Sequence, residues 1–431
     1  MTTTNARHIH LNSPTRRTFL KSVSATAGGL LLAVPDSWAR ETTPRVKLPV
    51  AGVATWYHPG SHAHVILGKI LEGWNQDGGP GPDLELVSLY IDQFSQDDMN
   101  RELAKKFGFR LAKSIDEAVN LGGDKVGVAG VLSIGEHGNY PHDPVTKQVL
   151  YPRKRFFDEI VAAMNRGGQF VPIFNDKHLS ARTEEAMAMY RTAKELNIPF
   201  MAGSSLPVAW RVPPLELPMG CHLEAAMAIG YGGLEGYGFH ALETLQCMVE
   251  RRRGGEVGVE AVRAARGEAI LEAEKEGYWS KELLAAALRT NRPELSDDWL
   301  AQFLKQGRPF YLIDYRDGFK SSVAMANYDR FLFACKLKDE QAPLATTFTL
   351  QGGIPHRHFA WLLRGIEHMV HTGQPAYPAE RTLITTGILD AAMRSLAQGD
   401  TRIETPQLEI AYTSTDWGYA PGQPPPPREE Y

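Results

Sequence analysis

Two side chains of the sequence, Lys177 and His240, are suited to proton transfer. Lys177 lies in Asp176-Lys177-His178, directly after a strand-like run at 170–174. A lysine at the carboxyl end of a strand in an open α/β sheet stands where such sheets bind ligands, and partial burial lowers its pKa enough to let it move a proton. His240 follows a glycine-rich stretch, and its ordinary pKa of about 6.5 lets it act as general acid or base. The alternatives are a surface lysine and a histidine satisfied within the core.

A loop after the strand-like segment 125–134 carries a second set of candidates, Glu136, His137 and Tyr140. Glycines on either side of Glu136-His137 free this loop to bring a carboxylate and an imidazole to the same edge of the sheet. Imidazole and carboxylate ligands together suit zinc, manganese or iron. The candidate ligands of a divalent metal are Glu136, His137, His178 and His240, although no linear motif such as HExxH supports them.

The elements that must position these residues alternate between strand and helix as far as about residue 208. The apolar patterns predict strands at 46–54, 84–91, 125–134, 170–174 and 199–203. Between them they predict helices at 64–74, 99–107, 114–120, 156–165 and 183–196. Strands separated by helices indicate an α/β fold, with a Rossmann-like, doubly wound parallel sheet over residues 45–208.

The pattern changes to that of an α+β domain over residues 209–412. Helices are predicted at 243–253, 257–276, 283–306, 359–371 and 380–398, and strands at 310–315, 321–325 and 345–350. Asp317-Gly318 between two β-prone runs is a strong hairpin signal. The tail, 413–431, contains four consecutive prolines, so we expect an extended surface segment, with a docking role as the alternative.

Composition excludes several classes of protein. With 431 residues, 43% of them hydrophobic and 22% charged, the chain is long and apolar enough for about two globular domains. A net charge of −4 gives no reason to expect nucleic acid as a partner. The three cysteines, Cys221, Cys247 and Cys335, have no CxxC spacing, so neither a disulfide framework nor a cysteine zinc site is predicted.

The N-terminus has the pattern of a cleaved twin-arginine export signal over residues 1–39. Arg16-Arg17 is followed by Phe19-Leu20-Lys21, an apolar run at 23–34 and the small-bulky-small triplet Ser37-Trp38-Ala39. The apolar run is too short to span a bilayer, so we expect a periplasmic or extracellular protein with no stable membrane anchor after cleavage. The alternative is a chance Arg-Arg beside an apolar helix.

Three stretches resemble the glucose-fructose oxidoreductase / inositol dehydrogenase (Gfo/Idh/MocA) family. Asp176-Lys177-His178 stands where that family carries Glu-Lys-Pro at the end of a Rossmann strand, before a Thr-led helix at 183. The run 232–240 resembles the family's glycine-rich approach to an Asp-x-x-x-His pair, with His240 at the histidine and Gly236 at the aspartate. Pro378-Ala379-Glu380-Arg381 and the following helix resemble the family's C-terminal helix.

The resemblance implies an oxidoreductase that acts on a secondary alcohol of a carbohydrate or polyol with NAD or NADP. Lys177 and His240 would then handle the hydroxyl proton. The expected cofactor contacts are Ser61 as the cap of a pyrophosphate-binding helix, Asp92 at a ribose diol, and Glu136. The expected substrate contacts are His137, Tyr140, His178, Trp210, Arg211 and Glu243. Glu243 would replace the missing aspartate, and interdomain packing is the alternative for Trp210 and Arg211.

One departure from the family leaves other functions open. The glycines that a dinucleotide site needs at its first strand-to-helix turn are absent, and the bulky pair Trp56-Tyr57 lies in that loop. The alternatives are a metal-assisted sugar lyase or isomerase without a dinucleotide, and a non-catalytic periplasmic carbohydrate-binding protein. A small-molecule carbohydrate is the expected partner in every case, and a homo-oligomer is a further possibility.

Overall fold

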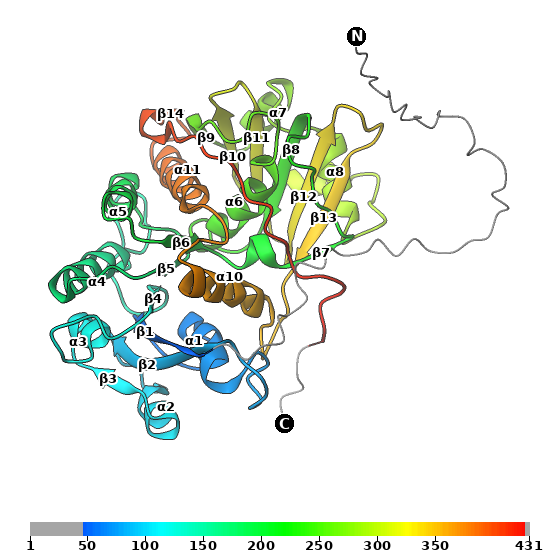
Figure 1. Ribbon diagram of the computed structural model, residues 1–431. Helices are drawn as coiled ribbons and strands as arrows, with labels where there is room; N and C mark the ends of the chain where they lie inside the picture. Colours follow the sequence, from blue (N-terminus) through cyan, green and yellow to red (C-terminus); the bar gives the residue numbers. More distant parts are fainter. Residues whose placement is uncertain (1–45, 427–431) are drawn as a thin grey trace, which may run out of the picture. The chain divides into compact units, whose positions relative to one another are not determined.

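The first of two β-sheets in the computed structural model, which describes residues 46–426, is parallel and six-stranded (Figure 1). Its strands are β1 (Leu48–Ala54), β2 (Leu84–Ile91), β3 (Arg110–Ala112), β4 (Gly130–Ile134), β5 (Ile173–Asp176) and β6 (Phe200–Gly203). They lie in the order β3-β2-β1-β4-β5-β6, and every neighbouring pair is parallel. The order reverses between β1 and β4, the point at which such sheets bind ligands. The predicted doubly wound sheet is confirmed.

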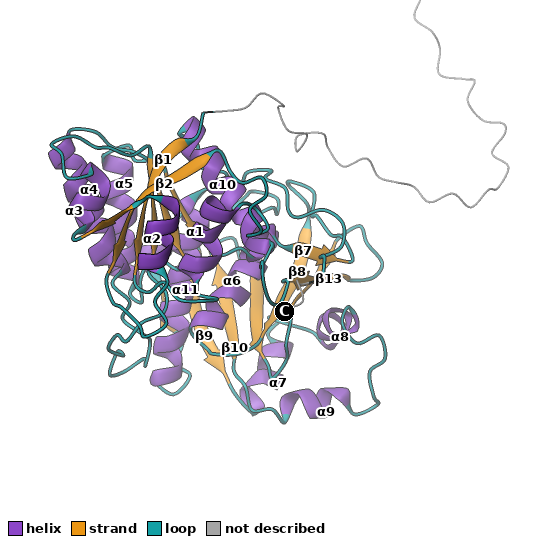
Figure 2. Ribbon diagram, turned by 90° about the horizontal axis from the view of Figure 1, so that it is seen from below, coloured by secondary structure: helices purple, strands orange, loops and turns teal. Residues whose placement is uncertain are grey.

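Helices cover both faces of this sheet (Figure 2). They are α1 (His62–Glu72), α2 (Asn100–Phe107), α3 (Ile115–Asn120), α4 (Arg153–Gly167) and α5 (Thr183–Glu195). One apolar core lies under α3, α4 and α5, and a second lies under α1 and the later helix α10 (His358–Thr372). Burial on both faces explains why β1 and β4 read as continuous apolar runs.

The second sheet is mixed and has eight strands in the order β14-β9-β10-β11-β8-β12-β13-β7. Its strands are β7 (Trp210–Val212), β8 (Leu223–Gly230), β9 (Val259–Ala265), β10 (Phe310–Tyr315), β11 (Lys320–Met325), β12 (Phe331–Leu337), β13 (Leu344–Thr349) and β14 (Ile403–Glu404). Only β11 and β8 pair in parallel. The predicted hairpin at Asp317-Gly318 joins β10 to β11.

The remaining helices follow the first sheet in the chain. They are α6 (Gly236–Val249), α7 (Glu268–Lys275), α8 (Lys281–Arg289), α9 (Trp299–Leu304), α10 and α11 (Ala379–Ala397). Of these, α7, α8 and α9 pack on the second sheet alone. In Figure 1, α11 lies between the two halves, where it contacts α5 and β6 on one side and β9 and α6 on the other. Nearly every residue of α11 is buried, because it packs against both halves. This shared helix holds the second domain against the carboxyl edge of the first sheet.

The predicted helix at 257–276 is wrong in its first half. Residues 259–265 form β9, which pairs with β10 on one edge and β14 on the other. Gly258 precedes β9 with a φ of +99°, and a Cβ at this position would lie 2.2 Å from the carbonyl oxygen of Leu408. This close backbone approach requires glycine and ends any helix before the strand begins. The predicted helix at 283–306 is likewise two short helices, α8 and α9, with Pro293 between them.

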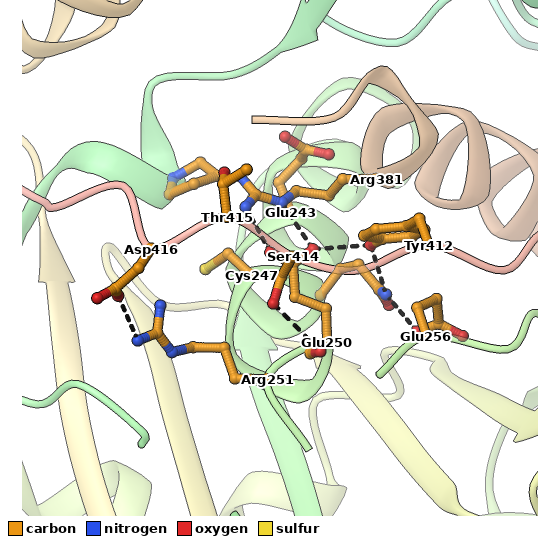
Figure 3. A network of polar contacts seen from close by, with 12 residues as sticks. Glu243, Cys247, Glu250, Arg251, Glu256, Arg381, Tyr412, Ser414, Thr415 and Asp416 are labelled. Carbon is orange, nitrogen blue, oxygen red and sulfur yellow. Dashed lines mark hydrogen bonds and ion pairs between the residues drawn. The ribbon is translucent and has the colours of Figure 1, made fainter. Parts of the chain in front are cut away.

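The described part of the C-terminal tail, residues 413–426, has no helix or strand and contacts the second domain. The indole nitrogen of Trp210 donates to the carbonyl of Pro421, and Gln351 donates to the carbonyls of Pro425 and Pro426. Figure 3 shows Asp416 bonded to Arg251 at 2.7 Å. The predicted signal peptide, residues 1–39, lies outside the described residues. Within residues 46–426, each helix is too short or too polar to cross a bilayer.

Candidate active site

Lys177 and His240 meet at the carboxyl edge of the parallel sheet. Lys177 directly follows β5 and α6 carries His240, and the lysine Nζ lies 2.9 Å from the imidazole Nε2. Lys177 is only 5% exposed and has a φ of +67°, in the left-handed region that non-glycine residues avoid. Such backbone strain costs on the order of 1–3 kcal/mol and concentrates at functional sites. The structure therefore brings together the two residues predicted to handle the proton.

Glu136 fixes the lysine from the opposite side. Its carboxylate lies 3.1 Å from the Lys177 Nζ and 2.8 Å from the guanidinium of Arg153. Burial by itself would raise the pKa of Glu136, but the charges of Lys177 and Arg153 outweigh it and hold that pKa well below its ordinary value. Glu136 is thus an ionised carboxylate that orients the ammonium towards His240.

His62 and Asp176 form a second pair at the same edge. The His62 Nδ1 lies 2.6 Å from the Asp176 Oδ2, and Asp176 is 1% exposed. The His62 ring also packs against those of His137 and Phe359, at centroid distances of 5.7 and 5.0 Å. A carboxylate at Nδ1 sets the orientation of an imidazole and leaves its Nε2 for a ligand. The pair joins α1, which carries His62, to the end of β5.

Two residues of this cluster, Arg153 and Glu235, were not predicted. Arg153 begins α4 and donates to Glu136 and to the His178 Nε2, the latter at 2.8 Å. Burial, followed by the charge of Arg153, lowers the pKa of His178 to about 4, so this histidine is neutral and accepts from the guanidinium. Glu235, the residue before α6, lies 3.7 Å from His178. Both lie outside the predicted helices at 156–165 and 243–253, so nothing marked them in the sequence.

His137 lies beside the cluster in a strained conformation, with a φ of +69°. Burial, then the charge of His62, lowers its pKa to about 4. Its ring contacts those of His58 and His62. Two further histidines have other neighbours: His64 accepts from the amide of Gly60, and the His222 carbonyl accepts from the amide of Lys338.

Several buried polar atoms of the cluster have no hydrogen-bond partner among the residues that the structure describes. They include Trp56 Nε1, His137 Nε2, Asp176 Oδ1, His178 Nδ1 and His240 Nδ1. Each buried polar group left unpaired costs about 1–3 kcal/mol, so such groups are rare without a function. The set contains donors and an acceptor, which suits water or a ligand with several hydroxyl groups.

The predicted metal site is not formed. Within residues 46–426, no three or more His, Cys, Asp or Glu side chains are grouped so that they could hold a metal ion. Of the candidate ligands, Glu136 binds Arg153 and Lys177, His178 accepts from Arg153, and His240 pairs with Lys177. Two cationic side chains thus occupy the positions between these ligands, where they would repel a divalent ion.

Asp92, the predicted ribose contact, is already engaged by protein groups. Its carboxylate accepts from Tyr90 at 2.9 Å, Tyr140 at 2.7 Å and Arg155 at 2.6 Å. Burial opposes ionisation, but these hydrogen bonds, led by that of Arg155, lower the pKa of Asp92 below its ordinary value. Tyr140, which was expected to contact substrate, instead donates to Asp92 at the end of β2.

The turn between β1 and α1 is also filled by its own side chains. Thr55 and Tyr57 are fully buried. The predicted cap is confirmed: the Ser61 Oγ accepts from the amide of His64, and it also accepts from the amide of His58. A dinucleotide that lies along this turn would therefore meet larger side chains in place of the usual glycines, and an Asp92 that already accepts three hydrogen bonds.

Trp210 and Arg211 hold the C-terminal tail and do not line this cluster. The Arg211 guanidinium donates to the carbonyls of Pro207 and Leu215 and to Glu216, and it lies 4.1 Å from the centre of the Tyr419 ring. The prediction of substrate contacts at these two residues is wrong, because Trp210 donates to the tail carbonyl of Pro421 and Arg211 lies against the tail residue Tyr419.

Replacing Arg211 with methionine is therefore expected to lower the free energy of unfolding by about 2–3 kcal/mol, because buried carbonyls lose a charged donor. KM for the substrate is expected to change less than twofold. Urea denaturation and steady-state kinetics measure the two effects. A tenfold rise in KM in a stably folded variant would mean that Arg211 contacts the substrate after all.

Glu243 is fully buried one turn after His240 but does not bond it. Its carboxylate accepts from Thr385 at 2.7 Å and from the amide of Ser204 at 3.3 Å, whereas the His240 Nδ1 has no partner in the described chain. The prediction that Glu243 takes the place of the missing aspartate, or contacts substrate, is wrong. Its carboxylate instead links α6 to α11 and to the end of β6, so Glu243 stabilises the elements that carry the site.

Burial raises the pKa of Glu243 to about 7, against an ordinary value of 4.5. Because the folded value is the higher one, this group stabilises the fold fully below about pH 4.5, and the contribution is lost as the pH rises through 7. The loss amounts to about 3 kcal/mol. We expect Glu243→Gln, which is neutral throughout, to lose clearly less stability than the parent between pH 5 and 8.5 in urea denaturation. The exposed Glu224→Gln is the control, and equal slopes for parent and Glu243→Gln would contradict this assignment.

Comparison with known proteins bears on the fold alone. No protein-family model matches the sequence, and no curated protein matches it. Among solved structures, GenD2 from gentamicin A biosynthesis, in complex with NAD, is 14% identical with a TM-score of 0.53, over 85% of this chain and 98% of that one.

Two further solved structures have a TM-score of 0.50. A myo-inositol dehydrogenase from Corynebacterium glutamicum ATCC 13032 is 13% identical, over 83% of this chain and 99% of that one. An oxidoreductase from Agrobacterium radiobacter, in complex with NAD+, L-tartaric acid and magnesium, is 12% identical, over 83% and 98%. The chain therefore shares its fold with these three solved structures.

Proposed function

We propose that the protein is an oxidoreductase that acts on a secondary alcohol of a carbohydrate or polyol, with NAD or NADP as the expected cofactor. The observation that carries the proposal is the 2.9 Å contact between Lys177 and His240 at the ligand-binding edge of the sheet. The fold supports it, since GenD2 and the Agrobacterium radiobacter oxidoreductase share this fold and were solved with NAD or NAD+. The cofactor itself is part of the proposal.

The chain's own residues would handle the hydroxyl proton. Burial and the adjacent Lys177 charge lower the pKa of His240 well below its ordinary value, so the imidazole is neutral and its Nε2 accepts from the Lys177 ammonium. This Nε2 would take the hydroxyl proton once the ammonium turns from it to the substrate oxygen. The Lys177 ammonium, held by Glu136, would then stabilise negative charge on the substrate oxygen. The unpartnered atoms of Asp176 and His178 would bind further hydroxyl groups.

A second candidate is a redox-neutral lyase or isomerase that uses the same proton-transfer pair without a dinucleotide. The observation that favours it is the filled dinucleotide region, where Tyr140 and Arg155 bind Asp92 and Tyr57 is buried in the first turn. The sequence analysis predicted this lyase or isomerase as a metal-assisted enzyme. Without a metal, Lys177 and His240 could still remove a proton next to a sugar carbonyl. A carbohydrate-binding protein without catalysis is the third possibility.

One experiment separates these functions. Gently purified protein is analysed by mass spectrometry for bound nucleotide, and titrated with NAD+, NADH, NADP+ and NADPH by calorimetry. Turnover of a panel of sugars and polyols is then followed by nicotinamide absorbance and by product analysis. An oxidoreductase shows nucleotide binding and nucleotide-dependent turnover. Turnover without nucleotide supports the second candidate, and carbohydrate binding without any turnover supports the third.

We further propose that the protein is exported by the twin-arginine route. Replacing Arg16 and Arg17 with lysine is expected to leave at least tenfold more precursor in the cytoplasm, because that route is selected by the arginine pair. Cell fractionation and the size of the mature chain measure the effect, with Arg40→Lys as the control. Unchanged export in the Arg16/Arg17 variant would exclude this route. Light scattering of the mature protein tests whether it forms a homo-oligomer.

A further inference from the structure

An exposed aromatic ring stands beside His240 in the first turn of α6. Tyr237 is 42% exposed, and its ring centroid lies 6.1 Å from that of His240 at an interplanar angle of 89°. The two residues are three positions apart on one helix, so they share a face. In the described chain, the other exposed aromatic side chain is Phe94, which follows β2. Tyr237 is thus an apolar surface next to the proton-transfer pair.

Neighbouring aromatic residues hold the Tyr237 ring in place. Phe331 is 1% exposed and stacks with it at 6.3 Å and 18°, and the Tyr231 ring lies against it at 4.9 Å and 60°. Gly232 has a φ of +73°, and a Cβ there would lie 2.7 Å from the Tyr237 ring. Packing from these neighbours fixes the ring, while a large share of its surface stays open to solvent. A rigid exposed aromatic ring costs little conformational entropy when it binds a ligand.

We propose that Tyr237 is a stacking platform for a pyranose ring, and hence that the substrate is a cyclic carbohydrate and not an open-chain polyol. The inference rests on the proposed function, since it places a sugar hydroxyl at Lys177 and His240. A pyranose has an apolar face of C–H groups that fits an aromatic ring and an edge of hydroxyl groups. Lys177 and His240, of which His240 lies beside the Tyr237 ring, would bind that edge. An open-chain polyol has no flat apolar face to stack.

Direct binding tests the platform independently of turnover. The mature protein is titrated with methyl β-D-glucopyranoside, methyl β-D-galactopyranoside and methyl α-D-mannopyranoside, and with the open-chain alditol D-glucitol, by calorimetry or saturation-transfer NMR. We expect at least one pyranoside to bind, and Tyr237→Ala to weaken its Kd about tenfold. Tyr237→Phe is expected to keep the affinity within twofold, because the ring is preserved. Phe94→Ala, which removes the other exposed aromatic ring, is expected to have no effect.

Three results would overturn the platform. They are a parent protein that binds none of the pyranosides, a Tyr237→Ala variant that binds them as the parent does, and an equal loss of D-glucitol binding in that variant. Thermal denaturation of each variant controls for the fold, and Tyr237→Leu, which removes the ring but keeps apolar bulk, takes the place of Tyr237→Ala if that variant unfolds. If pyranosides bind through Tyr237 but no sugar is turned over, the proposed enzymatic function fails and the platform stands.

Discussion

Lys177→Met is expected to lower kcat/KM by about 10³-fold while the protein stays folded. The variant removes the donor that lies 2.9 Å from the His240 Nε2 and leaves Glu136 with Arg153 as its remaining ion-pair partner. A positioned acid–base group contributes about 10²–10⁴-fold, and electrostatic stabilisation of a developing oxyanion adds to it. Methionine is close to lysine in length and apolar bulk, so the strained backbone at this position keeps a similar side chain. The loss should fall on kcat more than on KM.

The pair is expected to act as a unit. His240→Gln should cost a similar factor, and the double variant should lose little more than either single one, because each residue is ineffective without the other. Lys275→Met, at an exposed lysine with 72% of its side chain accessible, is the matched control and is expected to keep full activity. Circular dichroism and urea denaturation report the fold of each variant. A Lys177→Met variant with the kcat/KM of the parent would show that Lys177 and His240 do not take part in catalysis.

The sequence predicted well where the evidence was local. The Asp317-Gly318 hairpin and the alternation of strand and helix as far as β6 needed only neighbouring residues, and the structure has both. The strands β8 and β12 were not predicted. Both lie inside the second sheet with mostly buried side chains, so they show no polar–apolar alternation. For β9, pairing with two partner strands overrode a helical pattern.

The candidate site was predicted through positions at strand ends. Lys177 and Glu136 follow β5 and β4, and the carboxyl ends of parallel strands meet at one edge of the sheet. Arg153 and Glu235 could not be found this way, because helix starts become part of the site only after the second domain has packed against the first. The role of Arg211 could not be predicted either, because the tail residue Tyr419 comes to lie against it only in the folded protein.

Arg381→Met is expected to be the most destabilising of the variants considered, with a loss of about 3–5 kcal/mol in the free energy of unfolding. Arg381 on α11 donates through two nitrogens to Glu250 at the end of α6, with exposures of 5% and 1%. Tyr412 donates to the same carboxylate at 2.7 Å (Figure 3). Removal of one partner leaves a buried carboxylate without its counter-charge, which costs far more than the pair itself contributes.

The double variant Arg381→Met/Glu250→Leu separates the cost of the unpaired charge from the worth of the pair. Since neither side chain is then charged, we expect it to recover most of the lost stability, with a denaturation midpoint nearer the parent than that of Arg381→Met. Arg266→Met, which removes a half-exposed ion pair with Asp400, serves as the control and should cost less than about 1 kcal/mol. If the double variant were as unstable as the single one, packing of the arginine stem would hold α6 and α11 together, and the ion pair would not.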